Sequence, residues 1–531
     1  MTEKIPLAVG VTGHIPLREA DLDVLRATVR QELERLRASY PHTPLRMLCS
    51  LAAGADILCA DAAEELGIPL TAALPMEPGE YEKDFSGETL ESFRHHLGRA
   101  EESFTVPRAE KQADGTDGRE FRYRQAGIFV AEHCHVLLAL WDGTAQGGDI
   151  CGTAATVDFA LTGDYCPERG ASVRSGDNTL VIHILTPREG TGAEGAGTVR
   201  ILGNETACRE ILEKTDEFNR LAEESQPEGE NLLPPEETDP ATRRMETLYR
   251  RADGLSIRYA RVYRRALAAL ALAGTVVTFA FLLYDNGEVI PMILLCGAAL
   301  LYAFRRLRKA DRDACHRRFI EYRVLAESLR TQCCLRFAGS AVEAQRLMTW
   351  SQQRETAWIL CAVSAVNAAE PPREQRNIRE CWAEKQREYH RKAGKKTSHQ
   401  LAGNDRLLGT ALRASILLYV AVLVYEFVCG GVLAPAVWKL QDPETGRTLL
   451  KILLGTLSAG TLFLGGYYGR MSLSRVTGDH EKMEAFFGKI SERIARSGQN
   501  EDVLETLARE ELAENGNWSS YQRDNAVELN L

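Results

Sequence analysis

Four short segments of the chain carry residues that could hold a phosphate or a nucleotide. They are GVTGH (10–14), SLAAGAD (50–56), LPMEPGEYEKDF (74–85) and WDGTAQGGDICGT (141–153). Glycines in three of them would let backbone N–H groups approach an anion, and a helix that starts at such a turn adds the positive end of its dipole. Three such turns after apolar runs indicate a nucleotide site with its phosphate on backbone amides.

Acidic, imidazole and aromatic groups in these segments could recognise the rest of a nucleotide. Asp56 or Asp142 could accept a hydrogen bond from a ribose hydroxyl or an amino group, although the helix dipole alone also favours an acid in a first turn. His14 is either a ligand contact or a histidine bonded within its own turn. Trp141 could stack on a base or simply pack at the end of a strand.

The predicted ligand site comprises Gly10, Thr12, Gly13, His14, Ala53, Gly54, Asp56, Glu77, Asp142, Gly143, Gly147, Gly148, Gly152 and Thr153. No catalytic residue, metal ligand or cofactor is predicted beside the nucleotide-derived ligand. A net charge of −10 argues against direct nucleic-acid binding. The 13 cysteines include no CxxC pair, which is typical of free buried thiols in a reducing compartment.

The elements that must position these residues alternate between strand and helix over about the first 190 residues. Strands are expected at 7–9, 45–51, 69–74, 103–107, 135–141 and 179–185. Runs that are apolar on both sides, separated by amphipathic helices, indicate a parallel sheet with helices on both faces. The four segments should then meet beyond the carboxyl ends of the strands, where such sheets bind ligands.

Further along, four apolar segments approach the ~20 residues that span a bilayer. They are Ala266–Tyr284, 289–304, Ala414–Val437 and Ile452–Tyr468. Arginine and lysine gather on one side of them, at 261–265, 305–309, 406–413 and 470. The positive-inside rule then places both termini and the central helices in the cytoplasm of a multi-pass inner-membrane protein. The alternative is that these segments are core helices of a soluble protein.

Glu426 is the ionisable residue that stands out within these segments. A carboxylate at that depth is costly unless it is paired, neutral or facing water, so Glu426 could line a pore or a helix interface. The alternative is that the span ends near Tyr425 and leaves Glu426 at the outer interface.

GVTGH followed by SLAAGADILCADAA resembles the strand-turn pattern of the SLOG superfamily, which includes the DNA-processing protein A and the lonely-guy phosphoribohydrolases. GGDICGT is similar to the family's GGxGT phosphate loop, with three residues in place of one. The hydrolases continue as GGxGTxxE, and Thr156 stands where their glutamate would be. The paired hairpins, with RRFIEYRVLAESL (317–329) after the first, resemble the SLATT membrane module.

The resemblance implies a sensor-effector of bacterial anti-phage defence. Such a protein would bind a nucleotide signal, made by an enzyme from a neighbouring gene, and perturb the membrane as a homo-oligomer. The alternative is a membrane-tethered N-glycosidase that cleaves a nucleotide or NAD, with Glu77, Glu80 or Asp142 in place of the missing glutamate. A third interpretation is a constitutive channel or transporter with a regulatory nucleotide domain.

The predicted fold is thus an α/β Rossmann-like parallel-sheet domain followed by an all-α membrane region with four transmembrane helices. The expected domains are 1–205 (nucleotide sensing), 206–253 (helical linker), 254–340 (first hairpin), 341–404 (charged helices) and 405–531 (second hairpin).

Overall fold

The computed structural model describes residues 3–107, 118–144, 152–163, 178–188, 195–227, 230–372, 374–429 and 443–525. The chain divides into two compact units. The first unit comprises Met1–Leu255, Glu321–Ile378 and Gln499–Ser519, and the second comprises Ser256–Ile320, Arg379–Gly498 and Ser520–Leu531.

A seven-stranded sheet forms the centre of the first unit, with the strand order β4-β3-β2-β1-β5-β6-β7. The strands are β1 (Leu7–Gly13), β2 (Leu45–Cys49), β3 (Leu70–Leu74), β4 (Glu102–Thr105), β5 (Val136–Trp141), β6 (Leu180–Leu185) and β7 (Val199–Leu202). All neighbours are parallel except β6 and β7. The predicted Rossmann-like parallel sheet is therefore confirmed, with one antiparallel edge strand that was not predicted.

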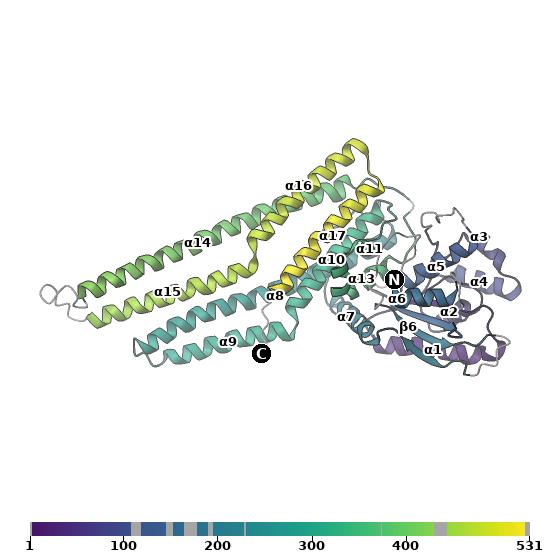
Figure 1. Cartoon of the computed structure of the whole chain (residues 1–531), viewed down its shortest axis with the longest axis horizontal. Coiled ribbons are helices and arrows are strands. Elements are labelled where there is room, and N and C mark those ends of the chain that lie inside the picture. Colours follow the sequence, from purple (N-terminus) through teal and green to yellow (C-terminus); the bar gives the residue numbers. More distant parts are fainter. Residues whose placement is uncertain are drawn as a thin grey trace. The chain divides into compact units, whose positions relative to one another are not determined.

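Both faces of the sheet are covered, because successive side chains of each strand point to opposite sides. Leu7 and Val9 pack with α1 (Leu22–Ser39), α2 (Ala55–Glu65), α4 (Gly87–Arg99) and α7 (Glu205–Glu223). Ala8 lies in the opposite core with α5 (Arg119–His133) and α6 (Thr153–Thr162). Figure 1 shows the helices around the strands.

The second core also receives residues from much later in the chain. Ala365 and Ala368 pack in it, at the end of the buried helix α13 (Ala357–Asn367). A hydrogen bond between His133 and Glu343 (3.1 Å) and an ion pair between Glu132 and Arg346 (2.6 Å) accompany this packing. The short helices α11 (Ala344–Leu347) and α12 (Trp350–Glu355) belong to the same unit. The sheet domain therefore needs residues beyond 320 to complete its core.

The second unit is helical. It contains α9 (Met292–Arg312), α14 (Lys385–Cys429), α15 (Pro443–Met471) and α16 (Leu473–Ser497). Three further helices pass from one unit into the other: α8 (Pro240–Asp285), α10 (Cys315–Phe337) and α17 (Glu501–Asp524). Within the second unit, α8 and α9 form one hairpin and α14 and α15 form another (Figure 1).

Among the described residues, three helical stretches are long and apolar enough to cross a membrane: Pro240–Asp285, Arg379–Phe427 and Glu444–Ser497. Four spans were predicted. The remaining one falls on α9, whose apolar part gives way to RRLRK from Arg305 onward and which does not meet the same criterion. The described part of the third predicted span is helical to Cys429, and its end at 430–437 lies outside the described residues.

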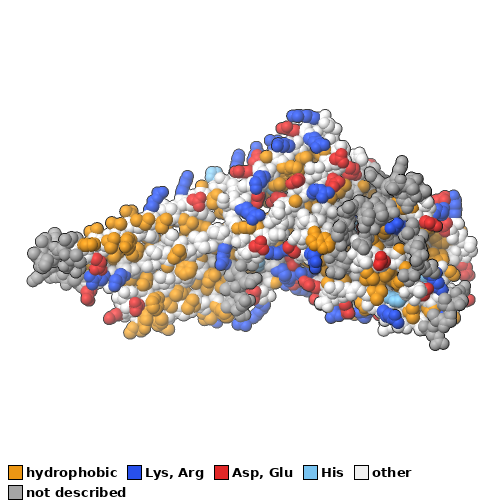
Figure 2. Space-filling view, in the orientation of Figure 1, with side chains coloured by type: hydrophobic (Ala, Val, Ile, Leu, Met, Phe, Trp, Pro, Cys, Tyr) orange, Lys and Arg blue, Asp and Glu red, His pale blue; other side chains and the backbone are white. Residues whose placement is uncertain are grey.

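The apolar side chains of these helices lie on the surface of the chain, as Figure 2 shows along both hairpins. Leu272, Leu294, Leu417 and Leu462 are 63%, 75%, 70% and 76% exposed. A water-soluble bundle would bury such residues, because a monomer rarely exposes a large apolar surface. These helices are therefore not the core of a soluble bundle formed by a single chain.

Small residues bring α8 and α15 close together. A Cβ on Gly274 would lie 2.7 Å from the ring of Phe463, and one on Gly455 would lie 2.6 Å from Leu282. Close approach through small residues is how helices associate in lipid, where apolar burial gives little driving force.

Candidate functional site

The carboxyl ends of β1 and β5 form the topological switch point of the sheet. From β1 the chain proceeds through β2 and β3 to β4 on one side, whereas β5 leads to β6 and β7 on the other. Open α/β sheets bind ligands in the crevice outside the strands at such a point. His14 follows β1 and Asp142 follows β5, so two of the predicted segments meet here.

The structure places Gly10–Gly13 in a strand and not in the predicted phosphate-binding turn. β1 was expected to end before Gly10, but it continues to Gly13, which pairs with Leu140 of β5. Thr12 lies in the same ladder, and the His14 N–H donates to the Leu140 carbonyl at 2.9 Å. These residues belong to a strand, and the next α-helix begins only at Leu22.

Helix packing explains the glycines of β1. A Cβ on Gly10 would lie 2.8 Å from Cys134 Sγ of the segment after α5. A Cβ on Gly13 would lie 2.3 Å from the Cβ of Ala55, the first residue of α2. Both glycines therefore let the neighbouring segments lie against the strand, which a larger residue would prevent.

His14, Asp142 and Arg188 form a compact cluster above β1, β5 and β6. The Asp142 backbone N–H donates to His14 Nε2 at 3.0 Å. The Arg188 Nε lies 3.0 Å from Asp142 Oδ2 and 3.3 Å from His14 Nε2. The arginine side chain keeps 39% of its surface exposed, so its guanidinium is accessible to solvent at the edge of the sheet although it is paired with Asp142.

The cluster fixes the protonation of its members. His14 accepts a hydrogen bond at Nε2, so its neutral form carries the proton on Nδ1. Burial, and then the Arg188 charge, lower the pKa of His14 against the opposing effect of Asp142. Burial would raise the pKa of Asp142, but hydrogen bonds from Thr144 and the charge of Arg188 lower it overall. The ground state is therefore a neutral imidazole beside a carboxylate–guanidinium pair.

The second segment forms a tight turn between β2 and α2. Leu51 has φ 55° and Gly54 has φ 82°, and left-handed backbone at a non-glycine residue is a mark of strain. Asp56 is buried, and its Oδ2 accepts from the N–H groups of Ser50 and Ala52, both at 3.2 Å. Burial raises the pKa of Asp56 to about 7 despite these bonds. Asp56 thus holds the turn together, and Ala53 and Gly54 are the partly exposed predicted residues there.

The third segment lies at the carboxyl end of β3. Glu77 is the N-cap residue of α3 (Pro78–Tyr81), is exposed and accepts a hydrogen bond from Thr105 Oγ1 at 3.2 Å. Glu80 forms ion pairs with Lys83 and Arg119, and the Lys83 and Arg119 bonds hold its pKa below the usual range. Both carboxylates therefore already have partners, from β4, from α5 and from their own loop.

The fourth segment is described only at its two ends. Gly143 has φ 78° and is exposed, which suits the sharp turn after β5. Gly152 is the N-cap residue of α6, and Thr153 is its first residue. Gly147 and Gly148 lie outside the described residues. The N-terminus of α6, which favours an anion, therefore stands at the same edge of the sheet.

Trp141 of this segment, and Thr156 just after the segment, both face the interior. Trp141 is 8% exposed, belongs to the second core and lies 5.6 Å from the His183 ring, so the packing role is the one observed. Thr156, at the position of the family glutamate, is buried, and its Oγ1 would lie 2.7 Å from a Cβ on Gly127. The side chain of residue 156 therefore packs against α5.

Glu426 is paired. Arg447 of α15 donates to both of its oxygens, Nε to Oε1 at 2.6 Å and Nη2 to Oε2 at 2.7 Å. The pair joins α14 to α15 near the ends of the two helices that face residues 430–442. A bidentate pair of this kind removes much of the cost of a charge in an apolar segment.

Arg188 was missed by the sequence analysis. It follows the last predicted strand, in the sequence TPREG (186–190), and lies outside the four segments from which the site was predicted. The signal that could have found it is positional: Arg188 is the first cation after the carboxyl end of β6, adjacent to the switch point.

No family model matches the chain, and neither a curated protein nor a solved structure matches it. The arrangement of residues described above is therefore the basis on which a function is inferred.

Proposed function

We propose that the chain is a membrane-anchored sensor-effector whose sheet domain binds a nucleotide-derived ligand at the His14–Asp142–Arg188 cluster. The observation that carries this proposal is the cluster's position at the β1/β5 switch point, beside the N-terminus of α6. Both features favour an anionic ligand in the crevice of an α/β sheet.

Each member of the cluster has a role in this proposal. The Arg188 guanidinium binds a phosphate, for which its planar set of donors is suited. Asp142 holds that guanidinium in place through the 3.0 Å contact. His14 offers Nδ1–H as a neutral donor, 3.5 Å from Arg188 Nη2. A ligand phosphate that binds Arg188 therefore also comes within reach of His14.

The sensor is favoured over the N-glycosidase by the state of the available carboxylates. A glycosidase needs a carboxylate that stabilises an oxocarbenium-like transition state. Residue 156 is a buried threonine, Glu80 is bound by two cations and Asp142 is bound by Arg188. Glu77 is exposed and accepts a hydrogen bond from Thr105, so it is the carboxylate left for the second candidate. Hydrolysis is accordingly the second candidate, and the experiment below distinguishes it.

Chain connectivity supports four membrane crossings. α8 starts in the first unit, and the chain is back in that unit at Glu321. If α8 crosses the bilayer, the chain must cross again between Asp285 and Glu321. α9, with 21 residues, is the described helix available for that crossing before α10. The same reasoning pairs α14 with α15, because the chain returns to the first unit at Gln499.

We place the sheet domain and both termini in the cytoplasm, with the hairpins in the inner membrane. The effector step is then a rearrangement of oligomeric hairpins that perturbs the bilayer, as the resemblance to SLOG and SLATT proteins of anti-phage defence implies. The ligand must bind the active arrangement more tightly than the resting one, or it shifts nothing.

The test uses the full chain in detergent, because residues 321–378 complete the core of the sheet domain. Thermal stability is measured with cyclic di- and trinucleotides, ADP-ribose and its cyclic forms, NAD and nucleoside monophosphates, and every hit is analysed for products. We expect a hit that is recovered intact and is lost in Arg188→Gln but kept in Arg30→Gln, on the outer face of α1.

Two results would contradict the sensor. A hit recovered as free base and ribose phosphate would establish the glycosidase. Stabilisation by no member of the panel, or stabilisation that Arg188→Gln leaves unchanged, would remove the cluster from ligand binding.

A further inference from the structure

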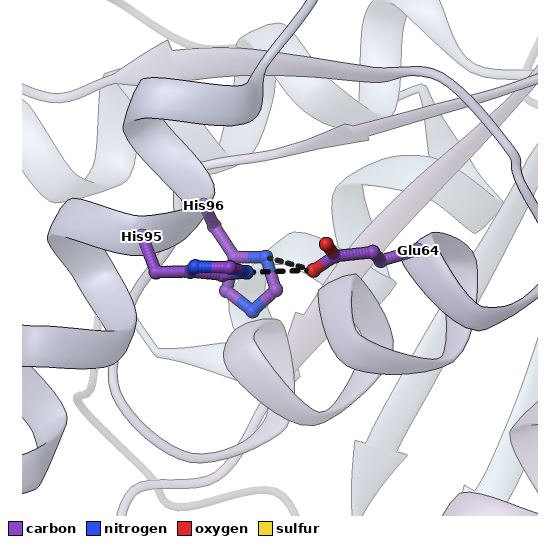
Figure 3. A group of neighbouring side chains, drawn as sticks. All are labelled: Glu64, His95 and His96. Atoms are coloured by element: carbon purple, nitrogen blue, oxygen red, sulfur yellow. Dashed lines mark hydrogen bonds and ion pairs between the residues drawn. The ribbon is translucent and has the colours of Figure 1, made fainter.

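We propose that Glu64, His95 and His96 form a binding site for a divalent transition-metal ion of the zinc type, which joins α2 to α4. The three residues offer ligand atoms that all lie within 4.8 Å of one another. Figure 3 shows both imidazole rings turned toward the Glu64 carboxylate. The site is separate from the ligand cluster and does not depend on the proposed function.

The distances suit one shared ion. Glu64 Oε2 lies 2.9 Å from His95 Nε2 and 3.6 Å from His96 Nδ1. Zinc binds imidazole nitrogen and carboxylate oxygen at about 2.0–2.2 Å, so two ligand atoms on one tetrahedral ion are separated by roughly 3.3 Å. The two observed distances bracket that value, and small side-chain adjustments would therefore admit an ion.

The second nitrogen of His96 already has the partner that a metal-bound histidine usually has. His96 Nε2 lies 2.8 Å from Asp61 Oδ1, one turn before Glu64 on α2. Histidine ligands almost always donate their second N–H to a carboxylate or carbonyl, which fixes the ring and raises its basicity. With Nε2–H bound to Asp61, the lone pair of His96 is on Nδ1 and points at Glu64.

Arginines hold the outer side of both carboxylates. Arg99 Nε contacts Glu64 Oε1 at 2.7 Å, and Arg26 Nη2 contacts Asp61 Oδ2 at 3.5 Å. Each carboxylate therefore keeps its other oxygen for a histidine. The two arginine side chains are 65% and 42% exposed, so solvent screens their repulsion of a cation.

The site is half open. His96 is 3% exposed and anchored between the helices, whereas the His95 side chain is 51% exposed. Two imidazoles and one carboxylate with free positions suit zinc, nickel, cobalt or copper better than magnesium or calcium, which prefer oxygen ligands. Water or a small anion would complete the coordination.

The experiment titrates the full chain in detergent with Zn²⁺, and with Co²⁺ as a spectroscopic probe. His390 and His480 form another histidine pair at 3.0 Å, so binding stoichiometry is compared between variants. We expect Glu64→Gln and His95→Gln each to lose one equivalent of metal and the associated Co²⁺ absorption. Glu65→Gln changes the exposed neighbour on α2 and should bind as the unchanged protein does.

Asp61→Asn tests the carboxylate that binds the second nitrogen of His96. It should weaken Zn²⁺ binding by about 10–100-fold while the stoichiometry is kept, because it removes the partner of His96 Nε2 and none of the three ligands. Binding that is equal in the unchanged protein, Glu64→Gln and His95→Gln would overturn the proposal. The cluster would then be an ion-pair network between two helices, as would also follow if the unchanged protein bound no metal.

Discussion

At the scale of single residues, burial and pairing decide which predicted groups are available for chemistry. Asp56 and Asp142 were predicted with the same two alternatives. The structure gives them different environments. The Asp56 carboxylate accepts hydrogen bonds from the amides of its own turn, whereas Asp142 contacts His14 and Arg188 at the edge of the sheet.

Asp56 should make stability depend on pH. Its pKa is about 7 in the folded protein and 3.8 as the ordinary value. A raised folded pKa means that the contribution to stability is fully present below pH 3.8 and is lost as pH rises through about 7. The side chain at position 56 does not titrate in Asp56→Asn. The stability of this variant relative to the unchanged protein should therefore rise by up to ~1.4 kcal/mol per pH unit across this window.

The measurement is the melting temperature of both proteins at pH 5 and pH 8. Asp23→Asn, on the exposed part of α1, is the matched control. Its melting temperature relative to the unchanged protein should be the same at both pH values. A difference between Asp56→Asn and the unchanged protein that is the same at both pH values would contradict the assignment.

At the scale of elements, close packing explains the glycines of β1. Gly10→Ala places a methyl group 2.8 Å from Cys134 Sγ and 2.9 Å from Val130 Cγ1. We expect a loss of about 1–3 kcal/mol, as for other overpacked cores. Gly98→Ala, in α4 with open space around it, should be neutral or stabilising by up to ~1 kcal/mol. The comparison is made by thermal melts, and a Gly10→Ala protein of unchanged stability that no longer binds ligand would instead indicate an anion site.

The Glu426–Arg447 pair should act as one unit in the second hairpin. Glu426→Gln or Arg447→Gln leaves the partner charge without its bidentate contact, so each should lower the melting temperature in detergent. The exchanged double variant, Glu426→Arg with Arg447→Glu, should recover most of that loss. If both single variants melt like the unchanged protein, the pair is not a structural tie between α14 and α15.

The strands of the sheet are the elements that the sequence predicts well. Strands that are apolar on both sides were predicted near their observed positions, because a buried parallel strand needs a continuous apolar run. The predicted end of β1 was wrong because glycine usually marks a turn. Here Gly10 and Gly13 instead make room for close contacts with Cys134 and Ala55. β7 is short and partly exposed, so its pattern gave no comparable signal.

The candidate site at His14, Asp142 and Arg188 could likewise be predicted only in part from the sequence. The sheet topology brings His14 and Asp142 together, and both were chosen from their turns. Arg188 depends on β6 lying next to β5, which is a matter of strand order and not of local sequence. The Glu64–His95–His96 group depends on the contact of α2 with α4 in the same way.

At the scale of the whole molecule, the return of the chain to its first unit predicts the crossing by α9. A cysteine at Asn286, in the turn between α8 and α9, should react with a membrane-impermeant maleimide in intact cells. A cysteine at Asp313, after α9, should react only after lysis. The ten native cysteines whose side chains the structure describes are buried and give little background. Equal labelling of both positions in intact cells would place α9 on one side of the membrane.

Continuous helices should carry the ligand signal to the hairpins. Two glycines inserted after Leu255, where α8 passes between units, should abolish ligand-induced leakage from vesicles and keep the thermal shift with ligand. The same insertion after Gln226, between α7 and α8, is the control and should keep both. Leakage that survives the α8 insertion would show that this helix does not couple the units.

The return of the chain to its first unit also sets the order of events during synthesis. The sheet is translated by residue 202, yet the unit around it also draws on 321–378 and 499–519. A ribosome must therefore synthesise both apolar hairpins before the first unit can be completed. A chain that stalls before these segments are made leaves that unit incomplete, and cellular proteases degrade incompletely folded chains. The first unit of this protein can thus be completed only after the apolar helices have been synthesised.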